Sequence, residues 1–320
     1  MIFNENGVEN TKRRLIFIAI AVAIVMGGYK YWFSTEARAE RYYKEGQELV
    51  QSGEKDKLDE AVAAYTKAIE LNPQSAKAYV GRANARTSKD CEKAIEDCNK
   101  AIEIDPKNSD AYLTFGKIYS KWKKDYEAAF ADYNQVVMLD PQNVEARLNR
   151  GYFYQKKKDF GKAIEDFTAV INNKDADPEK KAYAYSFRGF IYEHQNNYIG
   201  AIENFTKSIE LIDKEKRPQI AAAEYDNRGR CYLRLEEFQR ALADHTKAIE
   251  IDPQCIAPYS NRAFAYINLN NATQAVADCT EYIRRTSDPF GYSLRARAYR
   301  QLGDIAKAEA DEAIAEAGRK

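Results

Sequence analysis

The sequence has very little histidine: of its 320 residues only His194 and His245 are of this type, and they lie far apart. Because histidine is the most common general base at neutral pH, its scarcity removes many acid–base mechanisms. The chain also lacks a glycine-rich phosphate loop and any recognisable grouping of Ser or Cys with His and an acid. We therefore expect no enzyme activity and no bound cofactor.

Cysteine pairs are missing as well. The five cysteines are odd in number and scattered, with no Cys-x-x-Cys pair and no histidine at ligand spacing. This pattern excludes a disulfide framework and a zinc site, so no metal is expected. The cysteines are Cys91, Cys98, Cys231, Cys255 and Cys279.

A net charge is absent too, because 49 basic side chains balance 49 acidic ones. Binding to nucleic acid or to anionic lipid usually draws on an excess of positive charge over the whole chain or one region. We therefore expect no nucleic-acid partner.

The chain has one long apolar run, residues 15–33, which reads LIFIAIAVAIVMGGYKYWF with Lys30 as its single charge. As a helix it would span about 28 Å, close to the thickness of a bilayer core. Tyr29, Tyr31 and Trp32 suit the membrane interface, and Lys30 can extend its ammonium toward headgroups. The sequence thus predicts a short basic tail at 1–14 and a transmembrane anchor at 15–33.

A cleaved signal peptide is the alternative interpretation, because three basic residues at 12–14 precede the apolar run. The best small-x-small site, residues 37–39, lies beyond the run, with aromatic residues in between, which favours an uncleaved anchor. Basic residues flank both ends of the span. The triplet at 12–14 favours a cytoplasmic N-terminus with the remainder on the far side, and the opposite topology stays open.

After the apolar run the sequence repeats itself with a period of about 34 residues. The phrase KAIELNP ends at Pro73, KAIEIDP ends at Pro106 and again at Pro253, and VVMLDP ends at Pro141. Upstream of these phrases an alanine precedes an aromatic or small residue by one helical turn, which places both on one helix face. The pairs are Ala163 with Phe167, Ala201 with Phe205, Ala241 with His245, and Ala275 with Cys279.

The units share a pattern of a tyrosine, then Gly or Ala, a second tyrosine, a turn such as Gly303-Asp304-Ile305, an alanine and a final proline. The first tyrosines include Tyr185, Tyr225, Tyr259 and Tyr292. This pattern resembles the tetratricopeptide repeat (TPR). The resemblance implies an all-α, right-handed TPR solenoid of about eight helical hairpins over 36–320, preceded by the N-terminal transmembrane helix.

The eight units are predicted to start near residues 36, 75, 108, 143, 181, 221, 256 and 290. Departures from the period are an insertion at 52–57, one residue missing in the second unit, one extra in the third, and longer linkers at 173–180 and 213–219.

An arginine directly precedes the small residue in six units, and an acid or amide follows it on the second helix of the same unit. We predict an ion pair or hydrogen bond inside each hairpin. A ladder of arginines facing an acidic ligand is the alternative, but a carboxylate matches the arginine in five of the six units. The pairs are Arg82–Asp97, Arg150–Asp166, Arg188–Asn204, Arg228–Asp244, Arg262–Asp278 and Arg295–Asp311.

The resemblance further implies that the first helices of the hairpins line a channel for peptide segments. Two residues before the small residue stand amides, which can bind any peptide backbone. Just after it stand aromatic and cationic residues, which suit an acidic peptide, although each could equally be ordinary solvated surface. The predicted peptide-binding residues are Asn149, Tyr152, Asn227, Arg230, Asn261, Phe264, Arg297 and Arg300.

These patterns predict a membrane-tethered scaffold that binds peptide segments of partner proteins, for complex assembly or protein translocation. Acidic peptides and other membrane proteins are the candidate partners, since tethering raises the effective concentration of anything in the same membrane. An organellar import receptor or chaperone adaptor with its repeats in the cytosol remains an alternative.

Overall fold

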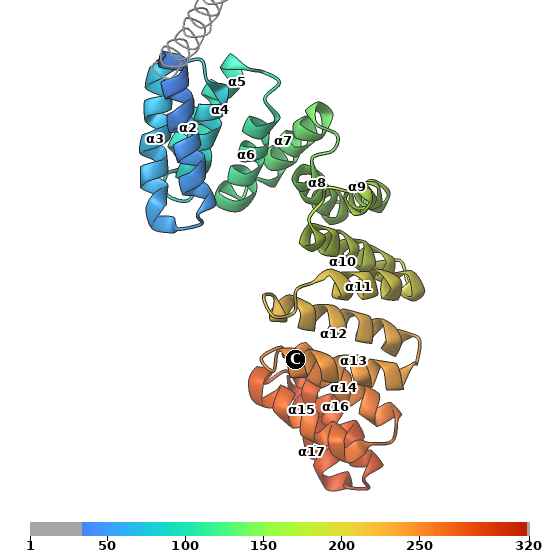
Figure 1. Ribbon diagram of the computed structural model, residues 1–320. Helices are drawn as coiled ribbons and strands as arrows, with labels where there is room; N and C mark the ends of the chain where they lie inside the picture. Colours follow the sequence, from blue (N-terminus) through green and yellow to red (C-terminus); the bar gives the residue numbers. More distant parts are fainter. Residues whose placement is uncertain (1–33, 319–320) are drawn as a thin grey trace, which may run out of the picture. The chain divides into compact units, whose positions relative to one another are not determined.

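The computed structural model describes residues 34–318, which form sixteen α-helices and no strand (Figure 1). This confirms the predicted all-α architecture of helical hairpins. The described residues divide after Pro141 into two compact units. Within 34–318 no helix is long and apolar enough to cross a bilayer. The predicted anchor, residues 15–33, lies outside the described part of the chain.

Unit 1 contains three hairpins. The insertion at 52–57 forms the loop of the first hairpin and includes a short 3₁₀ turn, η1 (Lys55–Lys57). The helices are α2 (Thr35–Gln51) with α3 (Leu58–Leu71), α4 (Ala76–Arg86) with α5 (Cys91–Ile104), and α6 (Ser109–Ile118) with α7 (Tyr126–Leu139).

Unit 2 contains five hairpins. Three of its first helices start with a proline, at Pro178, Pro218 and Pro289, which suits the first position of a helix. The first two of these helices begin one turn ahead of the predicted starts near 181 and 221. The helices are α8 (Val144–Lys156) with α9 (Phe160–Asn172), α10 (Pro178–His194) with α11 (Tyr198–Leu211), α12 (Pro218–Arg234) with α13 (Phe238–Ile251), α14 (Ala257–Asn268) with α15 (Ala272–Thr286), and α16 (Pro289–Gln301) with α17 (Ile305–Ala317).

The helix ends follow from local residues. Asp90 begins α5 by accepting a bond from the backbone N–H of Lys93 at 3.1 Å, and Asn143 caps α8 in the same way. Several second helices stop just before an Asn-Pro or Asp-Pro step, because a residue that precedes proline avoids the helical conformation. Such steps follow α3, α5, α7 and α13.

The extra residue of the third unit is absorbed as a π-helical turn, η2 (Tyr119–Lys123), at the end of α6. Lys124 follows in the left-handed conformation with φ 54° and ends the helix. The wider turn lets α6 keep its register with α7 although the unit is one residue longer than its neighbours.

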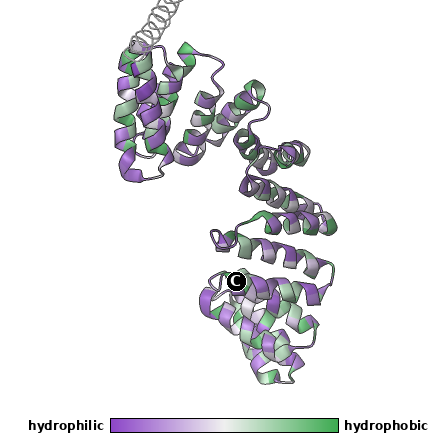
Figure 2. Cartoon of the chain, in the orientation of Figure 1, coloured by the Kyte–Doolittle hydropathy of each residue, from purple (hydrophilic) through white to green (hydrophobic). Residues whose placement is uncertain are grey.

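Every hairpin except the last packs a small residue of its first helix against a larger side chain of its second. A Cβ on Gly229 would come within 2.6 Å of the His245 ring. Alanine replaces glycine where a cysteine replaces the ring, as in the buried pair Ala263 and Cys279. The helices accordingly carry both apolar and polar residues along their length (Figure 2), as expected when one face of each helix packs in a core.

The predicted arginine links are present in all six hairpins and are confirmed as part of the scaffold. Arg228 binds Asp244 through two bonds of 2.8 Å, and a third bond of 3.0 Å reaches Thr206 of the preceding hairpin. The alternative of a free arginine ladder is therefore wrong. The other five links are Arg82–Asp97, Arg150–Asp166, Arg188–Asn204, Arg262–Asp278 and Arg295–Asp311.

The hairpin of α6 and α7 lacks this link. Phe115 occupies the arginine position, yet the acid is kept as Asp132. No hydrogen bond or ion pair to Asp132 is found within residues 34–318, and burial raises the pKa of its carboxyl to about 7.

Candidate functional site

The first helices of unit 2 line two adjoining cavities of about 660 Å³ and 370 Å³. Both cavities include Glu193 of α10 and Arg234 of α12, so they meet at these two side chains. Lining residues come from α8, α10, α12, α14 and α16, with further ones at the starts of α9 and α11. We call this surface the inner groove.

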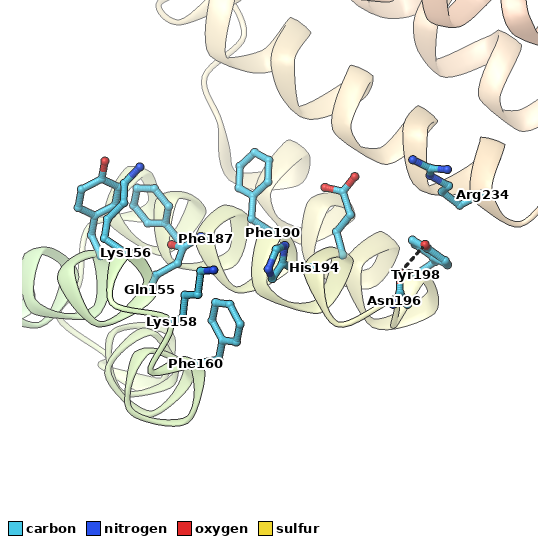
Figure 3. Close-up of a pocket in the computed structure, with 12 residues that line it drawn as sticks. Gln155, Lys156, Lys158, Phe160, Phe187, Phe190, His194, Asn196, Tyr198 and Arg234 are labelled. Carbon is cyan, nitrogen blue, oxygen red and sulfur yellow. Dashed lines mark hydrogen bonds between the residues drawn. The ribbon is translucent and has the colours of Figure 1, made fainter.

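The larger cavity has an aromatic lining (Figure 3). Phe187 stacks on the fully buried ring of Phe167, with ring centroids 5.4 Å apart, and Phe190 meets the buried Phe205 edge to face at 5.3 Å. Tyr152 packs beside Phe187 at 5.6 Å. Because buried rings support them, these aromatic side chains form a fixed apolar surface.

Cations surround this aromatic surface. Lys156 lies over the Tyr152 ring at 5.2 Å, while Lys158 follows α8 and Arg234 ends α12. In the part of the chain that the structure describes, none of these three cations has an acidic partner. Phe187 and Phe190 lie between Lys156 and Arg234 in Figure 3. The larger cavity is therefore both apolar and positively charged.

The acid in the groove is already neutralised. Glu193 accepts bonds from Arg230 at 2.8 and 3.1 Å, and this pair forms part of the smaller cavity. The rest of the smaller cavity is mainly apolar, with Leu233, Phe264 and the half-exposed Phe290.

A buried polar network supports the smaller cavity from behind. Asn261, which lines the cavity, donates to Asp226 at 3.0 Å. The same carboxylate oxygen lies 2.8 Å from Nδ1 of the fully buried His245. These bonds hold the Asn261 amide in one orientation.

A second buried acid joins α10 to α12 beneath the groove. Glu224 of α12 is 4% exposed and accepts a bond of 2.6 Å from the hydroxyl of Ser186 on α10. Burial is the main cause that raises the pKa of this carboxyl to about 7, against the hydrogen bond from Ser186.

The structure brings four of the eight predicted peptide-binding residues into the inner groove: Tyr152, Arg230, Asn261 and Phe264. The other four have different surroundings, as follows. Asn149 donates to the carbonyl of Glu145 in its own helix, Asn227 is only 7% exposed, Arg297 lies over the Phe264 ring at 5.4 Å, and Arg300 binds Glu312 at 2.6 and 2.8 Å.

Other residues of the groove were not among the predicted ones, notably Lys158, Phe187 and Arg234. Lys158 and Arg234 belong to the ends of first helices and the turns that follow, where residue types differ from one hairpin to the next. A helical projection of α12 beyond Gly229 could have identified Arg234. Phe187 precedes the small residue Gly189, and Lys158 follows α8 with φ 61°, so this signal does not reach either of them.

Unit 1 has a smaller cavity of about 340 Å³ on its first helices, lined in part by Tyr43, Tyr65 and Leu113. Its lining cations are Lys77, which is bound to Glu40 at 2.6 Å, and Lys117, and Asp110 adds negative charge to the lining. This cavity therefore has a smaller excess of positive charge than the inner groove.

The fold and the groove together define an α-helical repeat protein with a binding surface on its first helices. Models of the tetratricopeptide repeat match the chain in successive segments that together cover 46–177 and 180–254, and the chain belongs to this family. The matched segments are 180–254; 46–90 and 123–158; 97–131; and 77–108 and 144–177.

Solved structures share the fold. PilF of Pseudomonas aeruginosa aligns with a TM-score of 0.60 and 18% identity over 72% of this chain and 99% of its own. YrrB, described as a TPR protein with an unusual peptide-binding site, aligns with a TM-score of 0.50 and 25% identity over 61% and 95%.

A structure of the APC/C hetero-tetramer Cut9–Hcn1 aligns with a TM-score of 0.52 and 17% identity over 81% of this chain. The alignment spans about half, 49%, of that longer chain. No curated protein sequence matches this chain. Except for YrrB, these likenesses inform the fold alone.

Proposed function

We propose that this protein is a membrane-tethered scaffold that binds peptide segments of partner proteins in the inner groove. TPR proteins typically mediate protein–protein interactions, and YrrB is described as having a peptide-binding site. The observation that carries the proposal is the rigid aromatic surface of Tyr152, Phe187 and Phe190, which is open to solvent. Exposed rings of this kind are enriched where proteins bind one another.

Two observations support the proposed membrane tether: the apolar run at 15–33 and the position at which the solenoid starts. Because α2 begins at Thr35, the anchor would hold unit 1 close to the bilayer, with the N-terminus in the cytoplasm and the repeats on the far side. Partners in the same membrane then meet the groove at a high effective concentration, which suits complex assembly or protein translocation.

A crosslinking pull-down tests this function. The full-length protein in its own membrane is compared with the fragment 34–320 and with a full-length Phe187→Ala/Phe190→Ala variant. We expect the same partners with the first two proteins and their loss with the third. Partners that persist with the groove variant would contradict binding in the groove, and partners lost with the fragment would place recognition in the membrane segment.

The membrane topology has its own test. Protease added to sealed vesicles from the producing cell reports which side carries the repeats. We expect the repeats to be protected on the side away from the cytoplasm, and digestion from the cytoplasmic side would contradict this orientation.

A further inference from the structure

We infer that the inner groove selects an acidic peptide segment in which carboxylates lie between two bulky apolar side chains. This inference rests on the proposed function, since it names the chemistry of the peptide that the groove would bind. It follows from the charges of the groove, from their positions and from the two apolar cavities.

The charge of the larger cavity favours an acidic ligand. Three exposed cations, Lys156, Lys158 and Arg234, stand against one acid, Glu193, whose carboxylate is occupied by Arg230. The cations therefore present an uncompensated positive potential over an apolar surface of low dielectric. A carboxylate gains from this potential, and a lysine or arginine of a ligand is repelled by it.

The two apolar cavities favour large apolar side chains on the bound peptide. The larger cavity, about 660 Å³, is lined by rings from α8, α9, α10 and α11, and the smaller one by Leu233, Phe264 and Phe290. Buried apolar and aromatic anchors supply most of the binding energy at protein interfaces. Two separate apolar cavities thus indicate two anchor residues on one segment.

The position of Arg234 indicates that the carboxylates of the peptide lie between its two apolar side chains. Arg234 lies in the lining of both cavities, where they meet, and it has no ion-pair partner within residues 34–318. A chain that reaches from one cavity to the other must pass this guanidinium, which binds carboxylates well through its planar fork. Lys156 and Lys158 stand at the α8 end of the larger cavity and would meet acids beyond the first anchor.

The test measures binding of labelled synthetic peptides to the purified full-length protein by fluorescence anisotropy. The set holds two Phe or Leu anchors at varied spacing, separated by Glu, by Gln or by Lys. We expect the Glu peptides to bind best, the Lys peptides to bind at least about tenfold more weakly, and the preference to shrink as salt is raised.

Charge-reversed protein variants sharpen this test, because they change exposed side chains that make no ion pair. Lys158→Glu/Arg234→Glu should weaken Glu peptides by about tenfold and improve binding of Lys peptides, which a purely structural defect would not do. Lys174→Glu is the matched control: this exposed lysine lies in the loop after α9, makes no ion pair within residues 34–318 and lines neither cavity, so its change should leave both peptides unaffected.

The outcomes separate the two proposals. Equal binding of Glu, Gln and Lys peptides would overturn the acidic preference while peptide binding in the groove stands. A single-stranded oligonucleotide that displaces the Glu peptides with higher affinity would also overturn it, because stacked bases fit rings and cations too. If none of these peptides binds and crosslinked partners map outside the groove, the proposed function itself fails.

Discussion

The two units use the same repeat with different polar groups. Every hairpin of unit 2 links its first-helix arginine to an acid or amide of the second helix, whereas in unit 1 only the hairpin of α4 and α5 does. Asp244 is therefore paired with Arg228, while Asp132 at the equivalent position has a raised pKa. The repeat pattern therefore fixes the position of the carboxyl group. The presence or absence of an arginine partner then decides whether that carboxyl is ionised.

The two units also differ in whether the cations on the surface of their first helices are paired with acids. The unit 1 cavity holds Lys77, which is bound to Glu40, and Lys117 together with the acid Asp110. In unit 2, Lys158 and Arg234 have no acidic partner within residues 34–318. Unit 2 therefore combines a fully linked scaffold with unneutralised surface cations. This combination is what we expect of a rigid surface that binds an anionic segment.

Removing a paired acid should have the largest effect on stability. Asp244→Ala leaves the guanidinium of Arg228, which is only 17% exposed, without its carboxylate. We expect a loss of about 3 kcal/mol, because breaking a buried ion pair strands a charge. Hydrogen exchange of α12 and α13 measures this loss locally, since repeat arrays do not always unfold in one step. Unchanged protection would contradict a structural role for the link.

Glu224 should make the stability of unit 2 depend on pH. Its pKa is about 7 in the folded chain and near 4.5 when unfolded, so the unfolded state loses its proton first as pH rises. Stability should fall between pH 4.5 and 7, by up to about 3 kcal/mol, and level off above pH 7.

Replacing Glu224 by glutamine tests whether this carboxyl causes the pH dependence of stability. Glu224→Gln should be more stable than the parent at pH 8 and should lose the pH-dependent part that Glu224 contributes. Urea unfolding followed at pH 5 and pH 8 measures both effects. A parent and variant with equal stability at pH 8 would contradict a raised pKa of the buried Glu224.

Removing the Tyr152 ring from the inner groove should weaken peptide binding with little loss of stability. Tyr152 is 37% exposed, so Tyr152→Ala should cost about tenfold in affinity through lost ring contact. Tyr43→Ala in the unit 1 cavity is the matched control and should leave affinity unchanged. Fluorescence anisotropy with an acidic peptide measures both, and equal losses would remove the distinction between the two surfaces.

The smallest effect is expected at the unpaired acid of unit 1. Asp132→Asn removes a carboxyl whose charge is disfavoured by burial, so it should raise stability above pH 7 and change nothing near pH 4. The gain should be smaller than for Glu224→Gln, because Asp132 is only partly buried and solvent screens its charge. Asp244→Asn should do the opposite at neutral pH. Thermal unfolding of the two variants side by side measures the contrast, and a destabilised Asp132→Asn would show that this acid has a partner after all.

The sequence predicts the hairpins and the arginine links well, because the same residues recur at the same positions in many units. It does not reveal that η2 absorbs the extra residue of the third unit, since spacing alone does not choose between a π turn and a longer loop. Local pairing also escapes it: Arg300 binds Glu312, which stands where the preceding hairpins place a buried Tyr, Phe, His or Cys.

The sequence predicted only some residues of the inner groove, because only some of them occupy recurring positions of the repeat. Tyr152, Arg230, Asn261 and Phe264 adjoin the recurring small residue, so their place on the first helix follows from the repeat. Arg234 sits at a helix end where no type recurs, and its missing partner is visible only in three dimensions.

Photo-crosslinking tests most directly whether the inner groove of unit 2 binds an acidic segment. A peptide with two Phe anchors, intervening Glu residues and a photoreactive group at one anchor is irradiated with the full-length protein, and the labelled segments are identified by mass spectrometry. We expect labels on α10 and α12, competed by unlabelled peptide and lost when Glu is replaced by Lys. Labels confined to α2–α7, or labelling that ignores the charge of the peptide, would contradict it.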